Sequence, residues 1–341
     1  MRAFACPHCG AWLEFEDAAC LTCGSMVAYD PVRAAHVLLA DAAGCANRDE
    51  IGCTWVADGG ALCRACALTR MRPASDDAIG MPQFALAETA KRRLVYELLH
   101  LGLPVAPRSG ESGLAFDLLA VVNGVHATTG HADGVITVDL SESSDAHREE
   151  VRISLGEPYR TLLGHFRHEI GHYYWQVLVD GGARLGAFRA LFGDETVSYD
   201  AAVDAHYGDG GANGAGDEEH ISEYALMHPW EDFAETFAHY LHITDVLETA
   251  AALGLRVDGP TGVPAPLAGS LHAEGADRVD GFGMPEILTR WHAFSLALNA
   301  VDRSMGEEDF YPFVISPAVA DKLAFVHALV TEAAAQTHPF A

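Results

Sequence analysis

Of the 341 residues, 50% are hydrophobic and 20% are charged, which allows one sizeable core and a smaller module. The 21 basic residues stand against 48 acidic ones, a formal net charge of −27. Such acidity repels nucleic-acid phosphates and anionic membrane surfaces, so neither is expected as a partner, whereas a basic peptide would be attracted. The sequence has no apolar stretch before its first cysteines and no run as long as a membrane span, so we expect a cytoplasmic protein.

The first predicted element is a cysteine-rich module, residues 1–72, because all eight cysteines precede residue 67. In a reducing compartment such cysteines bind metal rather than form disulfides. The spacing predicts two structural zinc sites, taken in chain order as Cys6, Cys9, Cys20 and Cys23, and as Cys45, Cys53, Cys63 and Cys66. Spacing alone leaves a crossed arrangement open. Gly10 and Gly24 each follow a CxxC pair, where a tight knuckle needs a residue tolerant of positive φ.

After the cysteines the predicted elements are mostly helical, and the pattern is that of an α+β protein. A helix that ends at Gly102 is predicted from the apolar stripe Leu86, Ala90, Leu94, Leu98 and Leu101. Its Lys91, Arg92 and Arg93 are predicted to form a solvated face. Alternating β-branched residues predict a strand at Val135–Leu140. Further helices are predicted from near Pro158 to Asp180, at Leu185–Phe192, after Pro229, near 285–303 and near 317–335, with a flexible loop at 208–216 and an irregular segment at 254–283.

Residues 168–172 read His-Glu-Ile-Gly-His inside an amphipathic helical pattern. His168 and His172 are four residues apart and share a helix face, so both imidazoles can reach one zinc ion. Glu169 borders that face and can take a proton from a metal-bound water. The pattern therefore predicts a catalytic zinc, which is distinct from the two structural ions.

A catalytic zinc needs a third protein ligand and an open position. Glu231 and Glu235 lie four residues apart on one helical face, within an apolar and aromatic segment that indicates burial. One of the two can bind zinc while the other receives the second ring N–H of a ligand histidine. Tyr224 precedes Glu231 by seven residues, and on spacing alone it reads as a half-buried residue at a helix end.

The chain resembles the bacterial family of zinc-binding metallopeptidases that joins an N-terminal zinc ribbon to a zincin domain. The matching stretches are CPHCG, CRAC, AKRRLVYELLHLGLP, GEPYRTLLGHFRHEIGHYYW, HPWEDFAETFAHYLH and YPFVISPAV, which span nearly the whole chain. The resemblance implies a mostly helical zincin-like metallopeptidase domain over residues 80–341 that acts on a peptide or protein substrate.

Among zincins with a glutamate as third ligand, the segment EDFAETF resembles the corresponding helix of anthrax lethal factor. This likeness implies that Glu231 is the zinc ligand, that Glu235 orients a ligand histidine, and that Tyr224 stabilises the oxyanion. It also implies that the strand Val135–Leu140 borders the cleft and pairs with extended substrate. The chain departs from the likeness in its longer separation between His172 and Glu231.

Two alternatives stay open for the sequence. The first is an interaction protein, in which the zinc ribbon binds a protein partner and the zincin fold serves as a docking body. Glu169 weighs against it, because a scaffold has no need for a carboxylate beside the metal. The second is a zinc hydrolase of non-peptide amides, which shares its chemistry with a peptidase.

Overall fold

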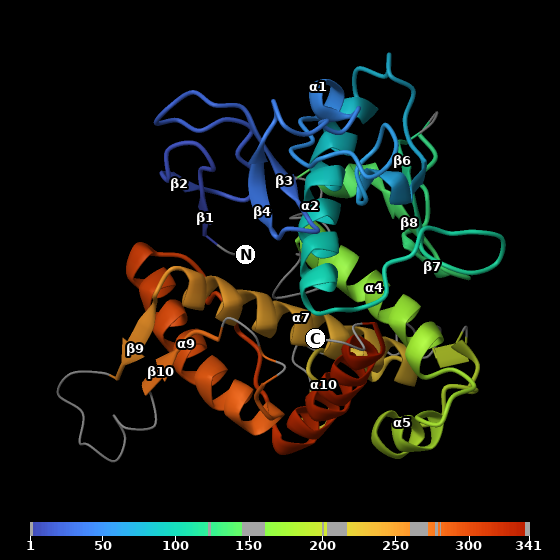
Figure 1. Ribbon diagram of the computed structural model, residues 1–341. Coiled ribbons are helices and arrows are strands. Elements are labelled where there is room, and N and C mark those ends of the chain that lie inside the picture. The colour runs from blue at the N-terminus through green and yellow to red at the C-terminus, as the bar shows by residue number, and fades with distance from the viewer. Residues whose placement is uncertain are drawn as a thin grey trace. The chain divides into compact units, whose positions relative to one another are not determined.

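The structure is a computed structural model that describes residues 3–121, 124–144, 161–199, 201–202, 217–259, 272–276, 279 and 281–337 (Figure 1). It contains two compact units. The first comprises Met1–Ser154 and Tyr159–Tyr173, and the second comprises Leu155–Pro158 and Tyr174–Ala341. The chain leaves the first unit and enters the second within one helix, α4 (Leu162–Leu178).

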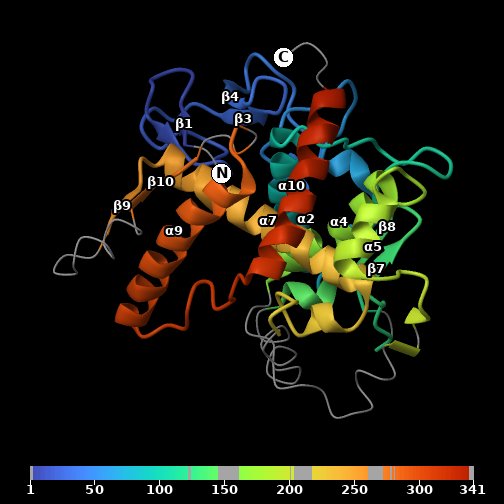
Figure 2. The same ribbon diagram turned by 90° about the horizontal axis from the view of Figure 1, so that it is seen from below.

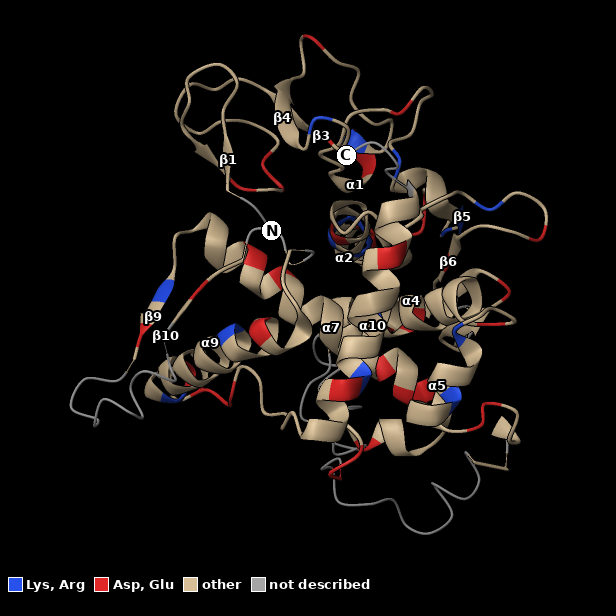
Figure 3. Cartoon of the chain, turned by 60° about the horizontal axis from the view of Figure 1, so that its bottom comes forward, with Lys and Arg blue, Asp and Glu red and all other residues tan. Residues whose placement is uncertain are grey.

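The predicted fold class is confirmed, since a cysteine-rich N-terminal region with small sheets precedes a mostly helical domain. Acidic residues are spread over the helices and loops of each unit (Figure 3, red). Among the helices that the structure describes, none has both the length and the apolar character needed to cross a membrane.

The cysteine-rich region of the first unit consists of short antiparallel hairpins and two helical turns. Its elements are β1 (Phe4–Ala5) paired with β2 (Trp12–Leu13), β3 (Val27–Asp30) paired with β4 (Ala35–Leu38), α1 (Arg48–Ile51) and η1 (Cys66–Leu68). Gly10 and Gly24 both have φ of 73°, as the knuckle prediction requires. Phe15 and Tyr29 pack against Tyr96 of α2 (Gly80–His100), with ring centroids 4.9 and 5.8 Å apart. The small module therefore completes its core on this helix.

Helix α2 corrects two expectations about its faces. Leu86 of the predicted apolar stripe is 55% exposed, whereas Phe84, Ala87 and Val95 are buried. The prediction of a solvated basic face is wrong as well, because Lys91 and Arg92 are buried at 0% and 3% exposure. A charged side chain can be buried only when it has a partner, and the Lys91 ammonium lies 2.5 Å from the Glu88 carboxylate.

A four-stranded sheet follows in the first unit, in the order β5–β6–β8–β7. The strands are β5 (Thr69–Met71), β6 (Ala115–Leu119), β7 (Gly130–Ala132) and β8 (Val135–Asp139), followed by the turn η2 (Leu140–Ser143). Strands β5, β6 and β8 are parallel, and β7 is antiparallel to β8. The predicted strand Val135–Leu140 is thus confirmed as β8, with Leu140 already in η2.

The second unit is built around α7 (Pro229–Ala252), which α9 (Met284–Met305) and α10 (Pro317–Thr337) contact (Figures 1 and 2). It also holds α5 (Leu185–Phe192), η3 (Tyr224–Leu226), and β9 (Arg256–Asp258) paired with β10 (His272–Glu274). The helices predicted for this region are confirmed, while the segment 254–283 is not wholly irregular because it carries this hairpin. The predicted helix start at Pro158 and the loop 208–216 lie outside the described residues.

Candidate metal centres

Helix α4 brings the two predicted ligand histidines together. Phe166, Ile170 and Tyr174 are fully buried at four-residue spacing, and His168 and His172 lie on the opposite side of the helix. The two Nε2 atoms lie 3.1 Å apart. Two nitrogens bonded to one tetrahedral zinc at about 2.0–2.1 Å would be roughly 3.3–3.4 Å apart. The imidazoles therefore converge as a shared cation requires.

The first half of α4 is anchored on both sides within the first unit. Arg167 forms a buried ion pair with Glu97 of α2, at 3.1 Å. Phe166 packs edge-on against Phe116 of β6, with ring centroids 5.7 Å apart. Glu169 is buried at 8% exposure beside the histidine face. A helix fixed in this way holds His168, His172 and Glu169 in place through its own packing.

Strand β7 adds a third histidine that the sequence did not single out. The ring of His131 stacks on that of His172, with centroids 6.5 Å apart and an interplanar angle of 14°. Its Nε2 accepts a hydrogen bond from the Gly134 amide at 3.0 Å. Burial, and secondarily His172, lowers the pKa of His131 to about 4. His131 is thus a neutral ring at neutral pH, and no motif marks it.

The expectation that β8 pairs with substrate is wrong. Strand β8 pairs with β6 along its whole length and with β7 from Val135 to Thr137, so its backbone groups there are already used in the sheet. The edges of the sheet are β5 and β7. Since β7 carries His131, the edge next to the α4 histidines is β7 rather than β8.

In the second unit, the first turn of α7 carries two buried carboxylates. Glu231 and Asp232 are 2% and 1% exposed. The helix begins at Pro229, a favoured first residue, and His228 caps it by accepting a hydrogen bond from the Trp230 amide at 3.0 Å. The Tyr199 hydroxyl donates to Oε1 of Glu231 at 2.8 Å. Tyr199, like His131, was not found from the sequence.

Glu235 lies one turn further along α7. Its Oε2 accepts a hydrogen bond from the Ser222 hydroxyl at 2.6 Å. Tyr224 lies two residues after Ser222, in η3, and is half-buried. The turn η3 contacts α7. The structure thus places Glu231, Glu235 and Tyr224 on adjoining elements of the second unit.

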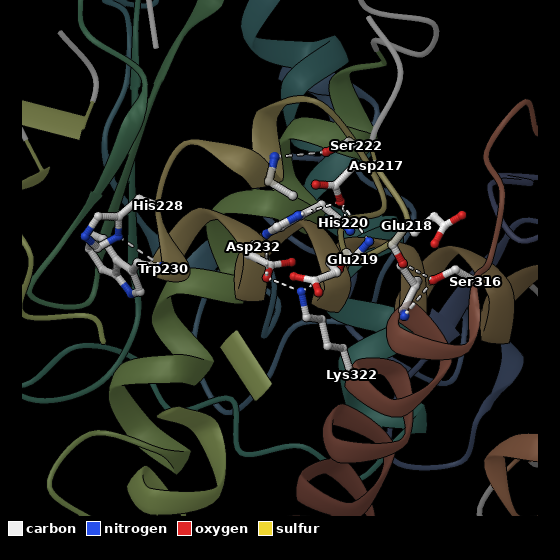
Figure 4. Close-up of polar contacts among 12 residues, drawn as sticks. Asp217, Glu218, Glu219, His220, Ser222, His228, Trp230, Asp232, Ser316 and Lys322 are labelled. Carbon is white, nitrogen blue, oxygen red and sulfur yellow. Dashed lines mark hydrogen bonds and ion pairs between the residues drawn. The ribbon is translucent and has the colours of Figure 1, made fainter. Parts of the chain in front are cut away.

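A buried lysine holds the segment before η3 against α7. Lys322 of α10 donates to Oδ2 of Asp232 and to the backbone carbonyl of Glu219, both at 2.6 Å (Figure 4). Burial raises the pKa of Asp232 to about 6, although Lys322 and His220 oppose the shift. This network fixes the chain segment that leads to Tyr224.

The cysteines form two groups with the sequential ligand sets that spacing predicted. In each group the sulfur atoms lie within 4.8 Å of one another. The measured separations are 3.8 Å for Cys6 and Cys23, 3.7 Å for Cys9 and Cys20, and 3.7 Å for Cys53 with both Cys63 and Cys66. Four sulfurs bonded to one zinc at about 2.3 Å would be about 3.8 Å apart. Both groups fit a tetrahedral zinc.

Two four-thiolate groups and a helix with paired histidines define a zinc protein with structural sites and a separate candidate catalytic site. A profile of the family described as "Putative zinc-binding metallo-peptidase" matches residues 80–329, and a zinc-ribbon domain profile matches residues 3–77. The chain belongs to this metallopeptidase family and carries an N-terminal zinc ribbon.

The relatives extend along the whole chain. An uncharacterized protein of Mycobacterium bovis and one of Mycobacterium tuberculosis are each 45% identical over 348 aligned positions, which cover 99% of this chain and 98% of the relative. No solved structure matches the chain. The names of these relatives give no activity and no substrate.

Proposed function

We propose that the chain is a zinc peptidase in which His168, His172 and Glu231 hold the catalytic metal and Glu169 acts as general base. The observation that carries the proposal is the 3.1 Å approach of the two Nε2 atoms on α4. A shared cation best explains why two imidazoles lie so near each other on a helix that is anchored by buried contacts.

Glu231 is supported as third ligand by the course of α4. In the second unit, Trp175 packs against Trp230 with ring centroids 6.0 Å apart, and Tyr174 stacks on Phe237 at 5.3 Å. His172 precedes Tyr174 by two residues, and Glu231 directly follows Trp230. Glu231 is a carboxylate at 2% exposure, and a carboxylate oxygen is a usual third protein ligand of a catalytic zinc.

The remaining residues take roles around this set. A zinc ion bound there would polarise the scissile carbonyl and lower the pKa of a bound water toward about 7. Glu169 takes the water proton and passes it to the leaving nitrogen. Tyr224 donates a hydrogen bond to the developing oxyanion. Glu235, held by Ser222, accepts the second ring N–H of a ligand histidine.

The proposed cofactors are three zinc ions. One catalytic ion is held by His168, His172 and Glu231, and each of the two cysteine groups holds one structural ion. The net charge of −27 favours peptides with basic residues as substrates. Eight cysteines used as metal ligands suit a reducing compartment, so we place the protein in the cytoplasm.

Glu169→Gln tests the mechanism. This nearly isosteric change removes the base and leaves the metal ligands, so peptide turnover should fall by about 10²–10⁴-fold while the zinc content stays that of the wild type. Cleavage of a mixed peptide library, followed by mass spectrometry, and elemental analysis measure the two quantities. An unchanged rate with full zinc would rule the mechanism out.

A protein partner for the zinc ribbon is favoured by a separate observation. Trp12 and Leu21 are 66% and 98% exposed on the region that carries the first cysteine group. A protein partner that binds the zinc ribbon would cover side chains of this kind. If the protein cleaves no peptide of the library yet retains a partner in both wild type and Glu169→Gln, the scaffold function replaces the enzymatic one.

A further inference from the structure

The hydrogen bond from Tyr199 to Glu231 joins two side chains that are 32 residues apart in the sequence. Glu231 belongs to the first turn of α7, and Tyr199 precedes this helix in a described stretch that ends at residue 199. The phenol is 38% exposed, whereas the carboxylate is 2% exposed. The contact is thus made at the rim of a buried carboxylate.

The Tyr199 ring is held by the residues that begin α7. It packs edge-on against His228 with centroids 5.4 Å apart, and against Trp230 at 6.4 Å. Nδ1 of His228 accepts from the Trp230 amide, so Nε2 carries the ring proton and donates to the Val197 carbonyl at 3.3 Å. His228 therefore ties the start of α7 to the segment that carries Tyr199.

A carboxylate has two oxygens, and this geometry gives them different tasks. The Tyr199 hydroxyl donates a hydrogen bond to Oε1 of Glu231 at 2.8 Å, which restricts rotation of the carboxylate. A metal would then be coordinated by Oε2 of a carboxylate that is already oriented. Removing a hydrogen-bond partner of this kind from a metal ligand typically lowers the metal affinity by about 10–100-fold.

We infer that Tyr199 is a positioning residue for the catalytic zinc, acting by orienting Glu231 for ligation through one oxygen. The inference rests on the proposed function, because it takes Glu231 as a ligand. Tyr199 affects metal affinity, whereas Tyr224 is proposed to act on the oxyanion. The two tyrosines thus have separable effects.

Tyr199→Phe tests the inference, since it keeps the ring contacts with His228 and Trp230 and removes only the hydroxyl. The holoprotein is dialysed against a series of zinc-buffered solutions, and its zinc content is measured by elemental analysis. The Kd of the most weakly held zinc should rise by about 10–100-fold, while the zinc bound by the cysteine groups stays in place. Tyr224→Phe is the matched control and should leave every zinc Kd unchanged while lowering kcat.

Glu231→Gln separates failure of the inference from failure of the proposed function. If Glu231→Gln loses the weakly held zinc but Tyr199→Phe binds it as the wild type does, Tyr199 has no positioning role. If Glu231→Gln retains that zinc, Glu231 is not a ligand and both proposals fall. Circular dichroism melting of each variant establishes that a change in Kd comes from a folded protein.

Discussion

The two cysteine groups have the same ligands but occupy different surroundings. In the first group Cys6 and Cys20 are buried, while Cys9 and Cys23 are exposed. In the second group all four cysteines are buried, at 0–2% exposure. A zinc in the first group would therefore lie near the protein surface, and a zinc in the second group would lie inside the hydrophobic core.

Helix α2 takes part in two ion pairs, and these pairs also differ in burial. Lys91 and Glu88 are both fully buried, and Oε2 of Glu88 lies 3.5 Å from the Cys66 sulfur, in hydrogen-bonding geometry. Arg93 of α2 pairs at 2.5 Å with Glu16, which lies in the segment between Cys9 and Cys20, and the two side chains are 39% and 33% exposed. Identical ligand chemistry can thus serve either to staple a surface loop or to organise a core.

The largest expected effect separates the two groups directly. Cys63→Ser should unfold the first unit, because all four cysteines of this group are buried in the core, and loss of a zinc there removes about 10–16 kcal/mol from a domain that has only about 5–15 kcal/mol of stability. Cys9→Ser should lose one zinc while α2 and the sheet stay folded. Circular dichroism melting with elemental analysis checks both, and equal losses of structure would remove the distinction between the groups.

An intermediate effect is expected for the buried ion pair. Lys91→Met leaves the Glu88 carboxylate buried without its cation, which should lower the free energy of unfolding by about 3–5 kcal/mol. The double variant Lys91→Met with Glu88→Leu should recover most of that loss, because it removes both charges. Urea unfolding followed by fluorescence measures the difference. A single variant as stable as the wild type would show that the pair contributes nothing to the core.

The smallest effect is expected at the exposed pair. Glu16→Gln should change the free energy of unfolding by less than about 1 kcal/mol, because solvent screens a pair that is one-third exposed. The same urea titration, at low and high salt, measures it. A loss comparable to that of Lys91→Met would mean that burial does not govern these pairs.

Much of the metal chemistry could be predicted from sequence because it is local. A CxxC turn directs two sulfurs at one point, and residues four apart share a helix face, so the spacing of Cys6 and Cys9 or of His168 and His172 already specifies their geometry. The same periodicity predicted the helix that carries Glu231 and Glu235.

What the sequence by itself determined is therefore the two cysteine groups and the helices that carry the candidate zinc-binding residues. Tertiary structure alone decided the burial of Lys91, the stacking of His131 on His172, the flanking of β8 on both sides and the bond from Tyr199 to Glu231. The last three join residues that meet only after the chain folds back on itself. Lys91 has its ion-pair partner Glu88 on the same helix, but it is buried by distant residues such as Phe116 of β6. Spacing in a sequence specifies angles along one element, and it carries no information about which distant element supplies the partner.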